Sequence, residues 1–357
     1  MRIAQIAPLF ESVPPSLYGG SERVVSWLTE ELVRLGHDVT LFASGDSHTA
    51  ARLVPGCEVA LWRDPDCRET LPHHVRMLEL VFREHERFDL LHFHCDYVHF
   101  PIVRRNACNH ISTLHGAVNP RDLGSLLHEY TDVPLVSISH SQRLPMPEAN
   151  WVANVYHGLP RDLHTFGEGG GDYLAFLGRI SPEKGLERAI AVARKTGNKL
   201  KIAAKVYEEE LPYFEHSIRP ILHENRSFTE YVGEIGGAAK NTFLQNAKAL
   251  LFPVEWAEPF GLVMIESLAT GTPVIAWRRG SVPEVIKDGV TGFIVDSIEE
   301  ATAAVMKLDR IDRHICRNDF EERFTSERMA RDYLHIYEER ISRNSIYKSV
   351  SAGVIGG

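Results

Sequence analysis

Two glutamates, Glu258 and Glu266, flank the segment Pro-Phe-Gly-Leu-Val-Met-Ile and form the strongest chemical signal in the sequence. The apolar run Ala249–Pro253 before them is typical of a buried strand, and a helix is expected to begin near Leu262. Such a turn presents backbone amides and the positive end of a helix to a phosphate. Glu266, one turn into the helix, would lie beside that anion and accept hydrogen bonds from a ribose diol. Glu258 would reach the other side of the phosphate, so the pair fits a nucleotide diphosphate joined to a sugar.

A second signal is the basic pair Arg179 and Lys184, in the loop Gly-Arg-Ile-Ser-Pro-Glu-Lys-Gly. This loop directly follows the strand-like run Tyr173–Leu177. Arginine offers a planar fork of donors and lysine a compact charge, so the two together match the charges of a diphosphate. Two basic residues in a loop are usually solvated surface; their position after a strand is what favours a binding role here.

Weaker signals lie in the first half of the chain, where polar residues or glycines follow strand-like runs. Paired glycines let the backbone approach a ligand closely, although most Gly-Gly pairs are simple turns. A lone histidine at the end of a strand is more often structural than catalytic. The residues concerned are Gly19 and Gly20 in the loop Tyr18–Glu22, His94, Asp96, His115 and Ser139.

Two further patterns contain residue types that bind metals, and neither is favoured as a metal site. Asp64-Pro65-Asp66 is a DxD tripeptide, which occurs often by chance and lies far from the signals above. In the run His92–Asp96, alternate strand positions point to opposite faces, so these side chains are not expected to hold one ion. We therefore expect no metal.

The elements that must position these residues alternate between short apolar runs and helical periodicity. Runs that are apolar throughout are typical of parallel strands buried on both faces, and the alternation predicts a doubly wound α/β architecture. The pattern pauses at the glycine cluster Gly167–Gly171 and then restarts. We therefore expect two domains, 1–166 and 172–325, joined by a hinge at 167–171, with a last helix, 326–342, that returns to the first domain.

Composition excludes several classes of protein. Of the 357 residues, 44% are hydrophobic and 24% charged, as in soluble globular proteins. The formal charge of −9 argues against nucleic-acid binding. The five cysteines are widely spaced and form no CxxC pair, which indicates reduced thiols. We expect a cytoplasmic protein without a transmembrane segment, because no signal-peptide layout is present and no apolar run approaches about 20 residues. Nothing in the sequence indicates the oligomeric state.

The motifs resemble those of retaining glycosyltransferases of family 4, which have the GT-B fold. The resemblance covers nearly the whole chain and includes two further segments, Gly271–Ile275 and Gly280–Glu284. It implies two Rossmann-like domains that face each other across a cleft. It also implies transfer of a hexose from a nucleotide diphosphate sugar, by default UDP-glucose, to a hydroxyl acceptor that the sequence does not identify.

The resemblance implies a role for each matching residue. Arg179 and Lys184 would hold the diphosphate, and His115 would line the reaction centre. Glu266 would bind the ribose and Glu258 the hexose. The remaining donor contacts would come from Gly19 and Gly20, from backbone at Ile235 toward the nucleobase, and from backbone at Phe260, Gly261, Leu262 and Val263; His94, Asp96 and Ser139 would line the acceptor side.

The mechanism expected from these roles needs no metal or other cofactor beyond the nucleotide sugar. The acceptor would attack the face that the diphosphate leaves, because no second carboxylate is evident for a double displacement. Two other functions stay open: another GT-B enzyme, such as a sugar-nucleotide epimerase, and a non-catalytic nucleotide-sugar binding protein. An epimerase would convert the donor without an acceptor, and a binding protein would convert nothing.

Overall fold

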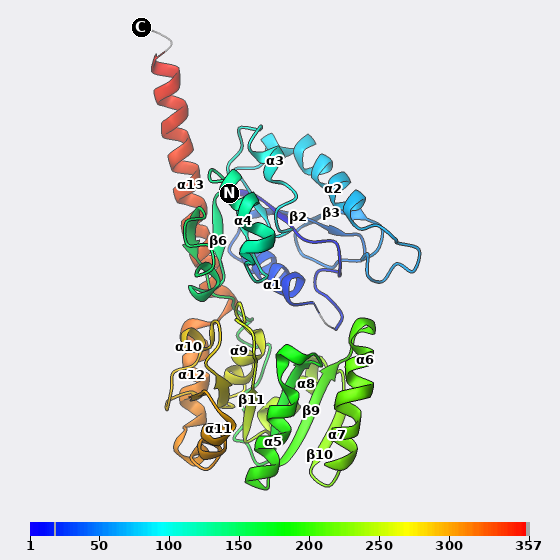
Figure 1. Ribbon diagram of the computed structural model, residues 1–357. Helices are drawn as coiled ribbons and strands as arrows, with labels where there is room; N and C mark the ends of the chain where they lie inside the picture. Colours follow the sequence, from blue (N-terminus) through cyan, green and yellow to red (C-terminus); the bar gives the residue numbers. More distant parts are fainter. Residues whose placement is uncertain (18, 355–357) are drawn as a thin grey trace. The chain divides into compact units, whose positions relative to one another are not determined.

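The computed structural model describes residues 1–17 and 19–354 and divides the chain into two compact units, each described here by itself (Figure 1). Unit 1 comprises Met1–Gly158 and the chain from Ser326 onward, and unit 2 comprises Leu159–Thr325. Both are α/β, with a parallel sheet and helical crossovers, as the alternating pattern predicts.

The division between the units falls before the glycine cluster, not at it. Gly167 and Gly171 lie within unit 2, where their amides donate to the carbonyls of Thr270 and Asn246 at 3.1 and 3.0 Å. A Cβ at Gly171 would lie 2.3 Å from the Asn246 oxygen. Close packing against this backbone therefore accounts for the glycine at position 171, and the boundary between the units, predicted at 167–171, lies at Gly158–Leu159.

In unit 1, the described residues form seven parallel strands in the order β3-β2-β1-β4-β5-β6-β7. The strands are β1 (Arg2–Ile6), β2 (Asp38–Ser44), β3 (Arg52–Cys57), β4 (Leu90–Phe93), β5 (His110–Thr113), β6 (Leu135–Ser137) and β7 (Trp151–Asn154). The helices are α1 (Gly20–Arg34), α2 (Leu71–Arg83), α3 (Phe100–Val103), α4 (Pro120–Glu129) and α13 (Ser326–Val354). The order reverses between β1 and β4, so the loops after these strands lie where such sheets usually bind ligands.

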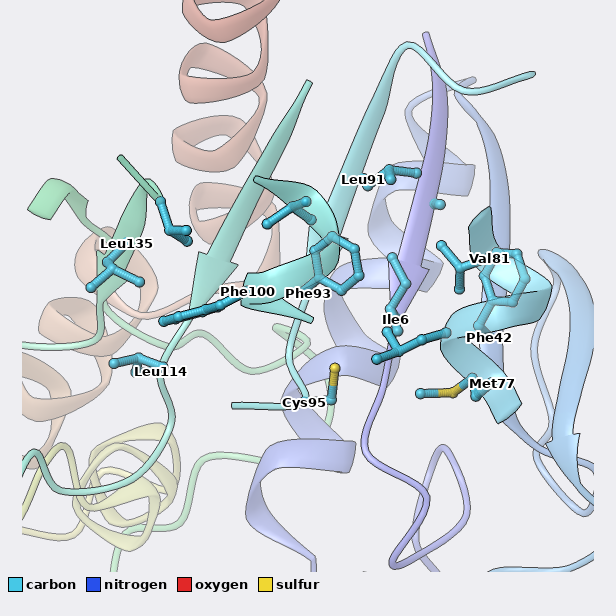
Figure 2. Packing of buried hydrophobic residues seen from close by; sticks show 14 of the residues in the cluster. Ile6, Phe42, Met77, Val81, Leu91, Phe93, Cys95, Phe100, Leu114 and Leu135 are labelled. Atoms are coloured by element: carbon cyan, nitrogen blue, oxygen red, sulfur yellow. The ribbon is translucent and has the colours of Figure 1, made fainter. Parts of the chain in front are cut away.

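The core of unit 1 explains its uniformly apolar central strands. Ile6 of β1, Phe42 of β2 and Phe93 of β4 are fully buried and belong to one cluster with Met77 of α2 (Figure 2). The edge strands β3 and β7 are half exposed and carry mixed sequences. Neither was predicted, because an edge strand that faces solvent lacks the continuous apolar run of a central strand.

In unit 2, the described residues form six parallel strands in the order β10-β9-β8-β11-β12-β13. The strands are β8 (Tyr173–Arg179), β9 (Lys199–Lys205), β10 (Thr229–Gly233), β11 (Ala249–Phe252), β12 (Val274–Trp277) and β13 (Gly292–Val295). The helices are α5 (Leu186–Thr196), α6 (Leu211–Tyr213), α7 (Arg219–Glu224), α8 (Gly237–Gln245), α9 (Leu262–Ala269), α10 (Val282–Val285), α11 (Ile298–Val305) and α12 (Arg313–Arg323). Here the order reverses between β8 and β11, which places both predicted donor loops at the point of reversal.

Candidate functional site

The loops after β8 and β11 are packed against each other by backbone contacts. The amide of Glu255 donates to the Glu183 carbonyl at 2.8 Å. Gly185, at the start of α5, has φ +67°, and a Cβ there would lie 2.2 Å from the Pro253 oxygen. The two loops that carry the predicted donor residues are thus one packed structure, which fixes the geometry of the site.

This contact predicts a specific cost for filling the space at Gly185. We expect Gly185→Ala to lower the free energy of unfolding by about 2–4 kcal/mol, because left-handed strain adds to a backbone clash. Gly197, at the other end of α5, has a similar φ of +63°, and a Cβ there would meet nothing within 4 Å. Gly197→Ala should therefore cost only the strain, about 1 kcal/mol. Denaturant unfolding of both variants measures the difference; equal costs would contradict the close approach.

Glu258 lies in the loop between β11 and α9, and its carboxylate is held by two donors. Its Oε2 lies 2.6 Å from Lys184 Nζ and accepts from Trp256 Nε1 at 2.9 Å. Glu258 is 8% exposed, and the Lys184 ammonium lies 5.1 Å from the centre of the Trp256 ring. The carboxylate predicted to contact the hexose and the ammonium predicted to hold the diphosphate therefore form a shielded ion pair.

The turn into α9 is fixed from both sides. Gly261 precedes the helix with φ +80°, and α9 begins at Leu262, as predicted. The carbonyl of Phe260 accepts from the Ser281 hydroxyl at 2.7 Å. Leu262 and Val263 are half buried in the first turn. These contacts hold the amide-bearing end of α9 in place, as a phosphate-binding turn requires.

Arg179, at the end of β8, is bound by two carboxylates. Its guanidinium lies 2.6 Å from Glu183 and 3.0 Å from Glu210. Burial works to raise the pKa of Glu183, but hydrogen bonds from Ser181 and Arg179 hold that pKa below its usual value. Burial raises the pKa of Glu210. Both predicted diphosphate-binding cations thus have carboxylate partners in this structure.

Glu266 lies on α9 and pairs with a lysine from the neighbouring helix. Its Oε1 lies 2.8 Å from Lys240 Nζ of α8, and its side chain is buried. Ile235 precedes α8 and lines a cavity of about 700 Å³ together with Val232 and Ala239. The predicted ribose and nucleobase contacts therefore both lie against α8.

In unit 1, His94 and His115 are directly bonded. His94 Nδ1 lies 2.9 Å from His115 Nε2, and the His94 side chain is buried. Burial lowers the pKa of His115 to about 4 and that of His94 well below its usual value, so both are neutral near pH 7. His115, which follows β5, is partly exposed, whereas His94 is buried.

The other residues predicted in unit 1 differ in exposure. Gly19 precedes α1 with φ +141°, and Gly20 is the first residue of that helix. Asp96 is exposed and adopts φ +52°, which is strained for a residue with a Cβ. Ser139 is fully buried, and its hydroxyl accepts from the Gln142 amide at 3.1 Å. Tyr18, beside these glycines, lies outside the described residues.

The predicted residues therefore form two groups, one in each unit. Unit 2 contains all four residues of the two signals found first, Arg179, Lys184, Glu258 and Glu266, and brings Lys184 and Glu258 into direct contact. Asp64 and Asp66 lie in a loop of unit 1, where the Asp66 amide donates to Asp64 at 2.9 Å. Among the described residues, no cluster of His, Cys, Asp or Glu has the arrangement of a metal site.

Sequence reasoning missed the partners of the site residues. Glu183 lies within the second motif and Trp256 lies two residues before the first, so both were available as local signals. No local signal indicated Glu210 or Lys240. Glu210 reaches the site through the packing of the segment after β9, and Lys240 through the packing of α8.

Comparison with known proteins agrees with this geometry. The model of Glycosyltransferase Family 4 matches residues 18–153, and that of glycosyl transferases group 1 matches residues 166–323. An uncharacterized glycosyltransferase of Methanocaldococcus jannaschii is 23% identical over 395 residues, covering 94% of this chain and 98% of that protein.

Solved structures share the fold at low sequence identity. The sucrose-phosphate synthase of Thermosynechococcus elongatus is 18% identical with a TM-score of 0.79, over 96% of this chain and 99% of that one. Anabaena HepE, solved in complex with UDP and glucose, is 14% identical with a TM-score of 0.73, over 95% and 100%. Two Rossmann-like domains of this kind define the GT-B fold. The chain belongs to the family 4 type of GT-B glycosyltransferases. Within the part of the chain that the structure describes, no helix is both long and apolar enough to cross a membrane.

Proposed function

We propose that this glycosyltransferase moves a hexose from a nucleotide diphosphate sugar to a hydroxyl acceptor, with retention of configuration and without a metal. UDP-glucose is the first donor to test. The observation that carries the proposal is the arrangement in unit 2, where Arg179 and Lys184 lie in a loop packed against the loop that leads into α9. Carboxylates for a hexose and a ribose, Glu258 and Glu266, lie in and after that turn.

In this proposal, the diphosphate of the donor replaces the carboxylates that now pair with Arg179 and Lys184. The diphosphate accepts hydrogen bonds from Arg179, from Lys184 and from the amides at the start of α9. As the glycosidic bond breaks, negative charge develops on the leaving phosphate, and these fixed donors stabilise it. The positive charge that the reaction needs is therefore supplied by protein groups, and no step is assigned to a metal.

We propose attack by the acceptor on the face that the diphosphate leaves. The acceptor oxygen forms the new bond to the anomeric carbon while the old bond to phosphate oxygen breaks, and the acceptor proton passes to that phosphate oxygen. Glu258 is held by Lys184 and Trp256, which suits hydrogen bonding to sugar hydroxyls better than covalent attack. Trapping a covalent glycosyl–Glu258 species would contradict this route.

The decisive experiment is a thermal-shift screen of nucleotide sugars, followed by mass spectrometry of products with an acceptor library. Stabilisation by a nucleotide sugar and a product heavier by one hexose support the proposal. Unchanged activity after chelation with EDTA supports the metal-independent form. Conversion of the donor without acceptor indicates an epimerase, and binding without any conversion indicates a binding protein; either outcome would overturn the transfer.

Glu266→Ala tests the ribose contact separately from the chemistry. We expect it to weaken binding of free UDP by roughly tenfold to a hundredfold, since hydrogen bonds to a charged group are lost. Isothermal titration calorimetry with UDP measures the effect. Glu299→Ala is the matched control, because Glu299 also pairs with a lysine, Lys195 at 2.7 Å, but is well exposed on α11. Equal UDP affinity in the two variants would remove Glu266 from the nucleotide site.

A further inference from the structure

A continuous chain of hydrogen bonds in unit 1 links α13 to His115. Gln5 of β1 donates from Nε2 to the Tyr337 hydroxyl at 3.1 Å. On its other side, Gln5 Oε1 lies 2.8 Å from His94 Nε2, and His94 Nδ1 lies 2.9 Å from His115 Nε2. The Tyr337 hydroxyl also lies 2.7 Å from His92 Nδ1. Every one of these side chains except His115 is buried.

The directions of these bonds determine which nitrogen of His115 carries its proton. An amide oxygen only accepts, so His94 must donate to Gln5 through Nε2. Neutral His94 then has a bare Nδ1, which requires His115 to donate through Nε2–H. Neutral His115 is left with a bare Nδ1, and among the described residues that atom has no hydrogen-bond partner.

Burial keeps the histidines of this hydrogen-bonded chain neutral. It lowers the pKa of His115 to about 4 and holds the pKa values of His92 and His94 well below their usual range. Each ring therefore has one donor and one acceptor near pH 7, so reversing one bond reverses the next.

We infer that Gln5 and Tyr337 are positioning residues for glycosyl transfer, which fix His115 with Nδ1 as an acceptor for a substrate hydroxyl. The inference rests on the proposed function, in which His115 lines the reaction centre. In this arrangement the Tyr337 hydroxyl gives its proton to His92 Nδ1, 2.7 Å away. Toward Gln5 it can then only accept, and only the amide nitrogen can donate to it, so the hydroxyl distinguishes the two ends of that side chain. Without this hydroxyl the amide can turn over, and the reversed chain places a proton on His115 Nδ1.

Tyr337→Phe tests the inference, with Tyr333→Phe as the matched control. Tyr333 is also buried on α13, but its hydroxyl bonds Thr113 at 2.9 Å and reaches His92 only through Thr113, whose Oγ1 lies 2.7 Å from His92 Nε2. Its removal leaves the bonds of Gln5 to Tyr337 and to His94 in place. Each variant loses one buried tyrosine hydroxyl, so a merely structural effect should be similar in both. Their thermal unfolding midpoints measure that shared effect.

The first readout is the ring ¹⁵N spectrum of the histidine-labelled full chain, with His115 assigned by comparison with His115→Gln. We expect a bare Nδ1 and a protonated Nε2 in the wild type and in Tyr333→Phe, and a protonated Nδ1 in a substantial fraction of Tyr337→Phe. A wild-type His115 already protonated on Nδ1, or a Tyr337→Phe spectrum like that of the wild type, would overturn the inference. This readout needs no substrate.

The second readout is the release of UDP from UDP-glucose. We expect Tyr337→Phe to lower kcat by about tenfold or more, with KM for the donor within about twofold of wild type, as for loss of a second-layer partner. Tyr333→Phe should stay within about twofold of wild type. Equal losses in both variants would reduce Tyr337 to a structural role. A wild type that releases no UDP would count against UDP-glucose as the donor, while the spectrum still decides the inference.

Discussion

Replacing Glu258 by glutamine should lower the rate of hexose transfer by roughly 100- to 1,000-fold while free UDP still binds. The carboxylate is expected to hold the hexose, a part of the donor that free UDP lacks. Glutamine has nearly the same shape but no charge, so the variant loses the ion pair with Lys184. In the wild type, Lys184 Nζ lies 2.6 Å from Glu258 Oε2. The Lys184 ammonium becomes more available to the diphosphate, and UDP affinity should stay equal or rise.

The measurements are the Kd for UDP by calorimetry and the rate of product formation by mass spectrometry. Glu255→Gln is the matched control, because Glu255 lies in the same loop and pairs with Arg188 at 2.7 Å, yet is half exposed. It should behave like the wild type in both assays. If Glu258→Gln instead lost UDP affinity and kept its turnover of bound donor, the division of roles between the two glutamates would be wrong.

Replacing Lys184 by methionine should weaken UDP binding by roughly tenfold to a hundredfold and lower kcat/KM by about 1,000-fold. Lys184 offers a point charge to the diphosphate, and its stabilisation of the leaving group grows as that charge develops. The same change leaves the Glu258 carboxylate, which is 8% exposed, without its cation. A buried charge without a partner is destabilising, so the thermal unfolding midpoint should also fall.

The stability loss must be separated from the loss of binding. Lys199→Met is the control for charge, because Lys199 pairs with Asp172 at 2.6 Å but is well exposed at the start of β9. The double variant Lys184→Met with Glu258→Gln removes both charges and should recover stability without recovering UDP affinity. Wild-type UDP affinity in Lys184→Met would exclude this lysine from the diphosphate site.

The elements that carry the site were predictable because their signals are local. Helix α9 begins at Leu262, as the turn residues before it indicate, and the central strand β11 spans Ala249–Phe252, within the apolar run that predicted it. Central strands are buried on both faces and show it in sequence. The boundary between the units was predicted at the glycine cluster but lies before it. Glycine is used both for linkers and for close backbone packing, and at Gly171 only the nearby carbonyl of Asn246 shows that packing requires it.

The order of residues along the chain by itself determined the α/β class, the family resemblance and the kinds of side chain that follow β8 and β11. It did so because strand burial, helix starts and charged loop residues each depend on a few neighbouring positions. The pairing of those charges was decided only by the tertiary structure. Lys184 meets Glu258 and Lys240 meets Glu266 across intervals that span whole strands and helices. Which cation pairs with which carboxylate depends on the strand order, because the strand order brings loops that are distant in sequence together. No local sequence pattern encodes a contact between residues so far apart in the chain.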